Sequence, residues 1–140
     1  MAYKIFIDAN IFIDFFDVSR KGYAEARQLF EAIEEGNAKA FISESVINIS
    51  EYILTKRINI NVFKQMIIDL MKIITILPCS NAIVLQAYRN AKNDLEDAVL
   101  YQIALENKMD FFITNNLKDF KKIQHPSLQI VSAKQLLELL

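Results

Sequence analysis

The chain has 140 residues, of which 53% are hydrophobic, and its formal net charge at pH 7 is -1. This length allows one domain with a hydrophobic core, and no apolar run approaches the roughly 18 residues of a membrane-spanning helix, so no membrane is expected as a partner. The charge does not indicate the strongly basic surface of many nucleic-acid-binding proteins. It does not exclude nucleic acid either, because local lysines and arginines can hold phosphates.

Several features of the sequence bear on its compartment and its domain organisation. The first residues lead directly into a strand pattern that ends at Asp8, so no signal peptide is predicted. The single cysteine, Cys79, excludes an internal disulfide, fits a reducing cytosol and is expected to pack as a small apolar side chain. Two glycines and two prolines leave no candidate linker. We therefore expect a cytoplasmic protein with one domain over residues 1–140.

The predicted elements alternate between strand and helix along the chain. In order, we expect a strand at 3–7, helices at 10–16 and 19–35, a strand at 40–42, a helix from Ser45 to about Lys56, a helix at 60–73, a strand at 74–77, helices at 80–91 and 95–107, strands at 111–113 and 128–131, and a last helix capped by Ser132. Such alternation requires crossover connections between parallel strands. The predicted fold class is α/β, a three-layer α/β/α sandwich with a five-stranded parallel sheet.

Four acidic residues lie where predicted strands end or helices begin: Asp8, Glu51, Asp97 and Asp119. The carboxyl ends of parallel strands meet at one crevice, where ligands bind to α/β sheets. Carboxylates that are distant in sequence are therefore expected to meet there. Because clustered carboxylates repel one another unless a cation neutralises them, the sequence predicts a divalent metal site.

The first two of these acids have different surroundings. Asp8 closes the first strand, and Asn10, two residues later, is a candidate N-cap for the helix that follows. Glu51 has Ile47 and Leu54 at helical spacing, which places it on or beside the buried face, where a carboxylate needs a partner or a metal. An edge position is the alternative for Glu51.

The other acids lie near the third and fourth crossovers. Asp94 and Asp97 share one face at a helix start, where the helix dipole favours negative charge. We expect Asp94 to be the N-cap, whereas Asp97 belongs to a face that turns towards the core. After the fourth strand, Thr114 and Asn116 can hold neighbouring carboxylates or a metal-bound water. The alternative is a polar turn that leads through Asp119 into a short helix.

Taken together and in this order, the motifs resemble those of a PIN domain. They are Asp-x-Asn after the first strand, Glu in the second helical region, an acidic helix start before Ala98, and Ile-Thr-Asn-Asn-x-x-Asp-Phe after the fourth strand. The resemblance covers nearly the whole chain and is strongest at residues 5–12 and 95–120. Many similar proteins are VapC-type toxins of bacterial and archaeal toxin–antitoxin pairs.

The resemblance implies a metal-dependent endoribonuclease that uses Mg²⁺ or Mn²⁺. It implies that Asp8, Glu51 and Asp97 bind the metal and that Asn10 and Thr114 support them. The fourth acid of many PIN domains aligns with Asn116, which is not acidic. The resemblance therefore makes Asp119 and Asp94 the substitutes for that acid, with Asn116 and Asp119 counted among the catalytic residues. The implied partners are an RNA substrate, an antitoxin protein and a second copy of the chain in a homodimer.

Two alternatives follow from the departures and from other classes of α/β domain. Asn116 favours a catalytically weakened PIN-like module that binds RNA or protein. A receiver or a phosphatase would handle phosphate on a similar fold, but Asn10 stands where such a phosphatase needs an aspartate. The high apolar content also suggests a partner surface, with Phe12, Phe15 and Phe16 as candidates either for that surface or for the core.

Overall fold

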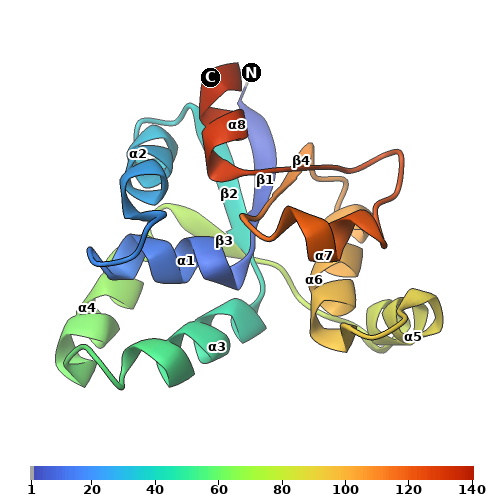
Figure 1. Cartoon of the computed structure of the whole chain (residues 1–140), viewed down its shortest axis with the longest axis horizontal. Coiled ribbons are helices and arrows are strands. Elements are labelled where there is room, and N and C mark those ends of the chain that lie inside the picture. Colours follow the sequence, from blue (N-terminus) through green and yellow to red (C-terminus); the bar gives the residue numbers. More distant parts are fainter. Residues whose placement is uncertain (1) are drawn as a thin grey trace.

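The computed structural model describes residues 2–140, and within them five strands and eight helices alternate along the chain (Figure 1). The strands are β1 (Tyr3–Ile7), β2 (Ala38–Ile42), β3 (Ile74–Ile76), β4 (Phe111–Ile113) and β5 (Gln129–Val131). The helices are α1 (Ala9–Phe16), α2 (Tyr23–Glu34), α3 (Glu44–Leu54), α4 (Ile60–Leu70), α5 (Asn81–Asn90), α6 (Leu95–Glu106), α7 (Leu117–Lys121) and α8 (Ala133–Leu139).

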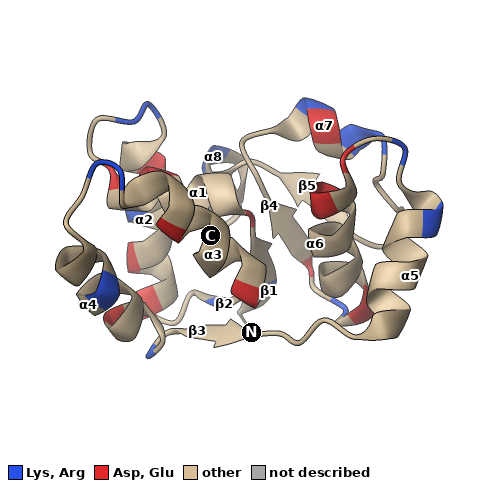
Figure 2. Ribbon diagram, turned by 90° about the horizontal axis from the view of Figure 1, so that it is seen from below, with Lys and Arg blue, Asp and Glu red and all other residues tan. Residues whose placement is uncertain are grey.

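The sheet has the strand order β3-β2-β1-β4-β5, and its four neighbouring pairs are all parallel. Figures 1 and 2 show α1 to α4 with α8 on one side of the sheet, and α5 to α7 on the other. Right-handed crossovers explain this division, because the chain reverses its direction across the sheet after β3. The predicted α/β/α sandwich with five parallel strands is confirmed.

The centre of the core lies on the two central strands, β1 and β4. Ile5, Phe6 and Ile7 form an uninterrupted buried run, as expected for a strand that is covered on both faces. Phe6 pairs in register with Phe112, and their rings stack with centroids 5.5 Å apart. The ring centroids of Phe120 in α7 and Phe112 are 4.6 Å apart. Burial of each such ring contributes roughly 1.5–3 kcal/mol to the free energy of unfolding. This packing holds the carboxyl ends of β1 and β4 and the start of α7 close together.

Several boundaries differ from the sequence prediction. Helix α2 starts at Tyr23 instead of Ser19 because the Asp17 carboxylate accepts hydrogen bonds from the Ser19 backbone N–H (3.0 Å) and hydroxyl (2.6 Å), which forms a turn. These bonds also lower the pKa of Asp17. Helix α3 begins slightly earlier than expected, with Ser43 as its N-cap. The prediction for the last helix is confirmed, because Ser132 caps α8 through a capping box with Gln135.

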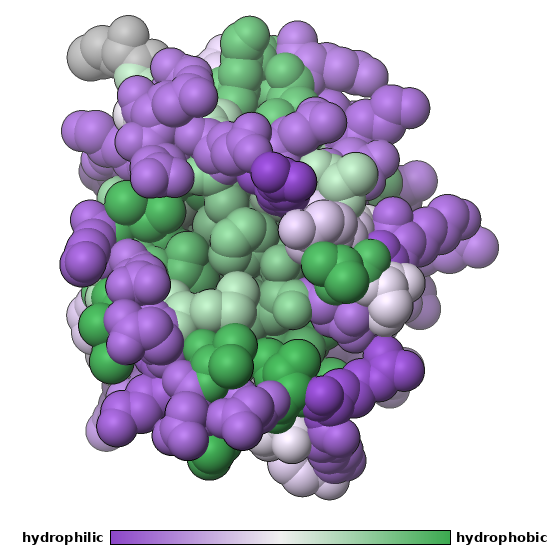
Figure 3. All heavy atoms as spheres, turned by 90° about the vertical axis from the view of Figure 1, so that its left-hand side faces the viewer, coloured by the Kyte–Doolittle hydropathy of each residue, from purple (hydrophilic) through white to green (hydrophobic). Residues whose placement is uncertain are grey.

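A groove of about 470 Å³ between α2 and the end of α4 is lined by both apolar and charged side chains. Phe15, Phe30 and Ile73 line it, and Figure 3 shows apolar residues framed by polar ones on this side of the molecule. Phe12 and Phe16 are buried, so these two rings belong to the core. Cys79 is exposed, so the expectation that it packs as a small apolar side chain is wrong.

None of the helices in residues 2–140 has both the length and the apolar character that a membrane crossing requires.

Candidate active site

The sheet has one topological switch point, which lies between β1 and β4. From β1 the chain adds β2 and β3 on one side, then crosses back to add β4 and β5 on the other. In α/β sheets the crevice at the carboxyl ends of two such strands binds ligands. Asp8 directly follows β1 and Thr114 directly follows β4, so both residues lie at this crevice.

Asp8 is held by three hydrogen bonds. Its Oδ1 accepts from the Ala9 backbone N–H (2.7 Å), and its Oδ2 accepts from Asn10 Nδ2 (3.0 Å) and from the Thr114 hydroxyl (2.8 Å). Asp8 is therefore the N-cap of α1, and the expectation that Asn10 caps this helix is wrong. The amide of Asn10 instead joins Asp8 to Thr114, whose Oγ1 also accepts from Asn10 Nδ2 at 3.1 Å.

Burial opposes the charge on this carboxylate. Asp8 is only 5% exposed, and desolvation raises its pKa, although the hydrogen bonds from Thr114 and Ala9 favour the charged form. The nearby charge of Glu96 raises the pKa further. Asp8 therefore lies in an environment where a positive charge would be strongly stabilising.

A second group of carboxylates lies at the start of α6 and on α7. Asp94, Asp97 and Asp119 each offer an oxygen within 4.8 Å of the others. Figure 2 shows acidic residues on the first turn of α6 and on the adjoining α7. Asp94 is the N-cap residue of α6, as predicted, and its side chain makes no capping hydrogen bond. Its carboxylate is therefore not occupied by the helix end.

The pKa of Asp97 is strongly raised. Desolvation raises its pKa from 3.8 to about 7, and the negative charges of Asp8, Asp94, Asp119 and Glu96 add to the effect. The influence of Asp8 on Asp97 means that the carboxylates after β1 and at the start of α6 belong to one electrostatic cluster. We call Asp8, Asp94, Asp97 and Asp119 the acidic cluster. Its hard oxygen donors and its crowded negative charge fit a divalent cation such as Mg²⁺ or Mn²⁺.

Asn116 contributes to this cluster through its hydrogen bonds. Its side-chain Nδ2 donates to Asp119 Oδ2 at 2.6 Å, and its backbone N–H donates to Thr114 Oγ1 at 3.0 Å. The amide at this position therefore orients the carboxylate of Asp119 and ties it to the end of β4. The predicted short helix after a polar turn is confirmed, and Phe120 anchors it in the core.

Glu51 lies elsewhere. It is exposed on α3, so the expectation that it lies on or beside the buried face is wrong. The reason is that Val46, Ser50 and Leu54 form the buried stripe of this helix, and Glu51 follows Ser50 on the outward side. Within residues 2–140, the charges that act on Asp97 are those of the acidic cluster and Glu96, and Glu51 is not one of them.

The sequence predicts that Glu51 is a metal ligand, whereas its exposed position outside the acidic cluster predicts that it is not, and Glu51→Gln decides between the two. We expect this variant to keep metal affinity within about twofold of the parent, because an exposed carboxylate outside the cluster contributes at most weak, screened attraction. Calorimetric titration with Mn²⁺ measures the effect. A loss of about tenfold or more would place Glu51 among the ligands.

Two features of the site have little signal in the sequence. Glu96 adds negative charge next to Asp97, and only its position in an acidic helix start hints at this. Asp14 is buried in α1, accepts from Arg20 Nε (2.7 Å), and also accepts from Asn115 Nδ2 (3.2 Å). Its place in the apolar run of α1 gives no sign that its partners come from the end of β4.

The comparisons with known proteins agree with this fold. Residues 4–118 match the family model of the PIN domain, and the chain belongs to the PIN domain family. A search of curated proteins gives no match.

Three solved structures share the fold of this chain. VapC20 of Mycobacterium tuberculosis, a sarcin–ricin loop cleaving toxin, is 12% identical with a TM-score of 0.66, over 81% of this chain and 92% of that one. VapBC2 of Rickettsia felis, bound to a DNA fragment from its promoter, is 17% identical with a TM-score of 0.67, over 92% of this chain and 98% of that one. A chain of a toxin–antitoxin complex from Klebsiella pneumoniae is 25% identical with a TM-score of 0.66, over 92% and 97%.

Proposed function

We propose that this protein is a metal-dependent endoribonuclease, and that it is the toxin of a type II toxin–antitoxin pair. The observation that carries the proposal is the acidic cluster at the switch point of a PIN domain, where the pKa of Asp97 is raised to about 7. Such crowding of carboxylates is costly without a cation, which makes a structural role for the cluster a poor explanation.

The proposed ligands are carboxylates of the acidic cluster. Asp94, Asp97 and Asp119 can place one oxygen each around a single ion. Asp8 supplies a further negative charge that acts on Asp97. Bound there, Mg²⁺ or Mn²⁺ would lower the pKa of a water molecule and neutralise charge on a phosphodiester.

The residues around the cluster hold its carboxylates in place. Thr114 and Asn10 both donate to Asp8 Oδ2, and Asn116 donates to Asp119 Oδ2. Hydrogen bonds of this kind fix the direction of the remaining oxygens, which is the task of outer-shell partners in metal sites. Burial of Asp8 and Thr114 keeps bulk water from their hydrogen bond. In this proposal Asn10, Thr114 and Asn116 are positioning residues.

The proposal includes the partners that such a toxin would have. One of the structural neighbours, from Klebsiella pneumoniae, is a toxin–antitoxin complex. An antitoxin protein, a homodimer and action on RNA in the cytoplasm are accordingly part of the proposal, with one PIN domain over residues 1–140. The open reading frame next to the gene is the first place to look for the antitoxin.

The experiment that tests the activity is cleavage of a panel of structured RNAs by the purified chain with Mg²⁺, Mn²⁺ or EDTA. We expect cuts at a few defined positions with either metal and none with EDTA. Cleavage that persists in EDTA would contradict a metal-dependent mechanism. The absence of cuts with every RNA and metal, from folded protein free of antitoxin, would contradict the nuclease proposal for that panel.

A catalytically weakened PIN-like module is the second candidate. Asn116 favours it, because this amide supplies no charge where many PIN domains have an acid. The position of Asp119 disfavours it, because Asn116 holds that carboxylate within the cluster. A module of this kind would bind RNA, and Mn²⁺ in a calorimetric titration, without cutting the RNA.

A further inference from the structure

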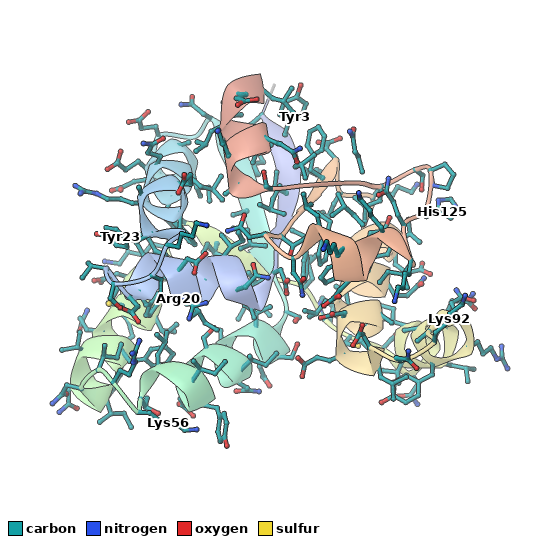
Figure 4. All side chains as sticks on the ribbon, in the orientation of Figure 1. Tyr3, Arg20, Tyr23, Lys56, Lys92 and His125 are labelled. Atoms are coloured by element: carbon teal, nitrogen blue, oxygen red, sulfur yellow. The ribbon has the colours of Figure 1, made fainter. Side chains whose placement is uncertain are left out.

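A cavity of about 570 Å³ opens beside the acidic cluster, between the start of α2, the β4–α7 loop and the start of α8. Arg20, Lys21 and Lys134 bring three positive charges to its wall, and Asn115 and Ser132 bring neutral polar groups. The carboxylates of Asp14 and Glu25 also line it. We call this cavity the Arg20 pocket, and Figure 4 labels Arg20 on the segment that joins α1 to α2.

A hydrogen bond to a buried carboxylate holds the side chain of Arg20 in place. Asp14 is 6% exposed, and its Oδ1 accepts from Arg20 Nε at 2.7 Å. Within residues 2–140, this bond is the one hydrogen bond of the guanidinium, and 38% of the Arg20 side chain is exposed. The two terminal nitrogens therefore remain available to a ligand in the pocket. A planar guanidinium held in this way suits the paired oxygens of a phosphate.

Gly22 allows the loop to approach Asp14 this closely. A Cβ atom at this position would overlap the Oδ2 atom of Asp14 and would lie 3.2 Å from Asn115 Nδ2. The absence of a side chain at Gly22 thus brings the α1–α2 loop, with Arg20 and Lys21, against the end of β4. The local sequence is built to place these two cations at this point.

Hydrogen bonds connect the Arg20 pocket to the acidic cluster. Asn115 donates through Nδ2 to Asp14 and through its backbone N–H to Asn10 Oδ1 at 3.3 Å. Asn10 in turn donates to Asp8 at 3.0 Å. Asn115 also directly follows Thr114, which bonds to Asp8. The cationic pocket and the acidic cluster are therefore linked by hydrogen bonds at the carboxyl ends of β1 and β4.

We propose that the Arg20 pocket binds a backbone phosphate of the RNA strand, next to the bond that the acidic cluster cuts. Arg20 contacts the phosphate, and Lys21 and Lys134 attract the strand. This inference rests on the proposed function. The physical basis of the inference is the spacing of phosphates along RNA. If one phosphate of the RNA lies at a cation in the acidic cluster, the next phosphates must lie along the neighbouring protein surface. Arg20, Lys21 and Lys134 carry three positive charges, and Asp14 and Glu25 carry two negative ones, so the pocket is positive overall. Asp14 is already paired with Arg20.

The test uses variants that leave the acidic cluster intact. Lys21→Gln with Lys134→Gln removes two exposed charges. The matched control is Lys4→Gln with Lys39→Gln, which removes two exposed charges at paired positions of β1 and β2, away from the carboxyl edge. Fluorescence anisotropy of a labelled short oligouridylate in EDTA measures affinity without cleavage. We expect the double variant to bind about tenfold more weakly, with a slope of log K against log salt that is shallower by about 0.7 for each phosphate that the variant no longer neutralises.

Arg20→Lys separates geometry from charge. A lysine that pairs with Asp14 lacks the two terminal guanidinium nitrogens with which Arg20 can bind a phosphate. We therefore expect weaker RNA binding despite an unchanged net charge. Thermal melting checks that each variant is folded. Parent-like affinity and salt slope in the double variant would overturn the proposal, and so would a parent chain that shows no salt-dependent binding of RNA. If the pocket binds a protein partner instead of RNA, the double variant should bind RNA with the affinity and salt slope of the parent.

The test of the Arg20 pocket can fail or succeed independently of the nuclease proposal. If the parent cuts RNA, we expect the double variant to raise KM several-fold with kcat little changed, since the two lysines attract substrate and transition state equally. Cutting with unchanged KM would refute the pocket and leave the nuclease. Weaker RNA binding by the double variant of a chain that never cuts would support the pocket and refute the nuclease.

Discussion

Asp97→Asn is expected to lower the rate of RNA cleavage by more than about a hundredfold. Loss of even an outer-shell partner of a metal site can cost about 10–100-fold in activity, and Asp97 offers a carboxylate oxygen to the cluster itself. Asparagine has nearly the same shape but no charge, so the packing of α6 should survive. The measurement is single-turnover cleavage of the best RNA of the panel in Mn²⁺, with circular dichroism to confirm the fold.

The matched control is Asp69→Asn, which removes one negative charge from an exposed position on α4. This variant should cut RNA at the parent rate, because its charge lies outside the acidic cluster. Asp8→Ala should behave as Asp97→Asn does, since Asp8 acts on Asp97 electrostatically. If Asp97→Asn and Asp8→Ala, both folded, cut RNA as fast as Asp69→Asn, the acidic cluster is not the active site.

The fold was accessible from the sequence because its strands are short, apolar and separated by amphipathic helices. The run Ile5-Phe6-Ile7 and the run Phe112-Ile113 mark buried central strands without ambiguity. The start of α2 was less accessible. No apolar residue between Ser19 and Gly22 marks where the helix begins. The hydrogen bonds of Asp17 with Ser19 compete there with the helix backbone.

The site was accessible only in part. Asp8 and Thr114 follow strands directly, so parallel topology alone brings them to one edge. Glu51 shows the limit of this reasoning, because a rotation of α3 about its axis decides whether the residue faces the core or solvent, and two apolar neighbours did not determine it. The pair of Asp14 and Asn115 could not be predicted, since it depends on how the α1–α2 loop packs against β4.

The metal-free protein is expected to lose stability as the pH rises from about 4 to about 7. Asp97 has a pKa of about 7 in the folded chain, against an ordinary value of 3.8. Between these values the folded state keeps a proton that the unfolded state has released, so the free energy of unfolding falls as pH increases. Above about pH 7 Asp97 is charged, and its repulsion with the neighbouring carboxylates is then present.

A divalent cation should relieve the repulsion among the carboxylates, as the proton on Asp97 does at lower pH. We expect Mn²⁺ to raise the melting temperature more at about pH 8 than at about pH 5, because protons compete with the metal for the carboxylates at the lower pH. Melting curves of the parent and of Asp97→Asn, in EDTA and in Mn²⁺, measure this. In EDTA the variant should lose the part of the decline that Asp97 causes, because its amide does not titrate, and the part caused by the raised pKa of Asp8 should remain. An equal gain from Mn²⁺ at both pH values, in parent and variant alike, would mean that the metal binds away from Asp97.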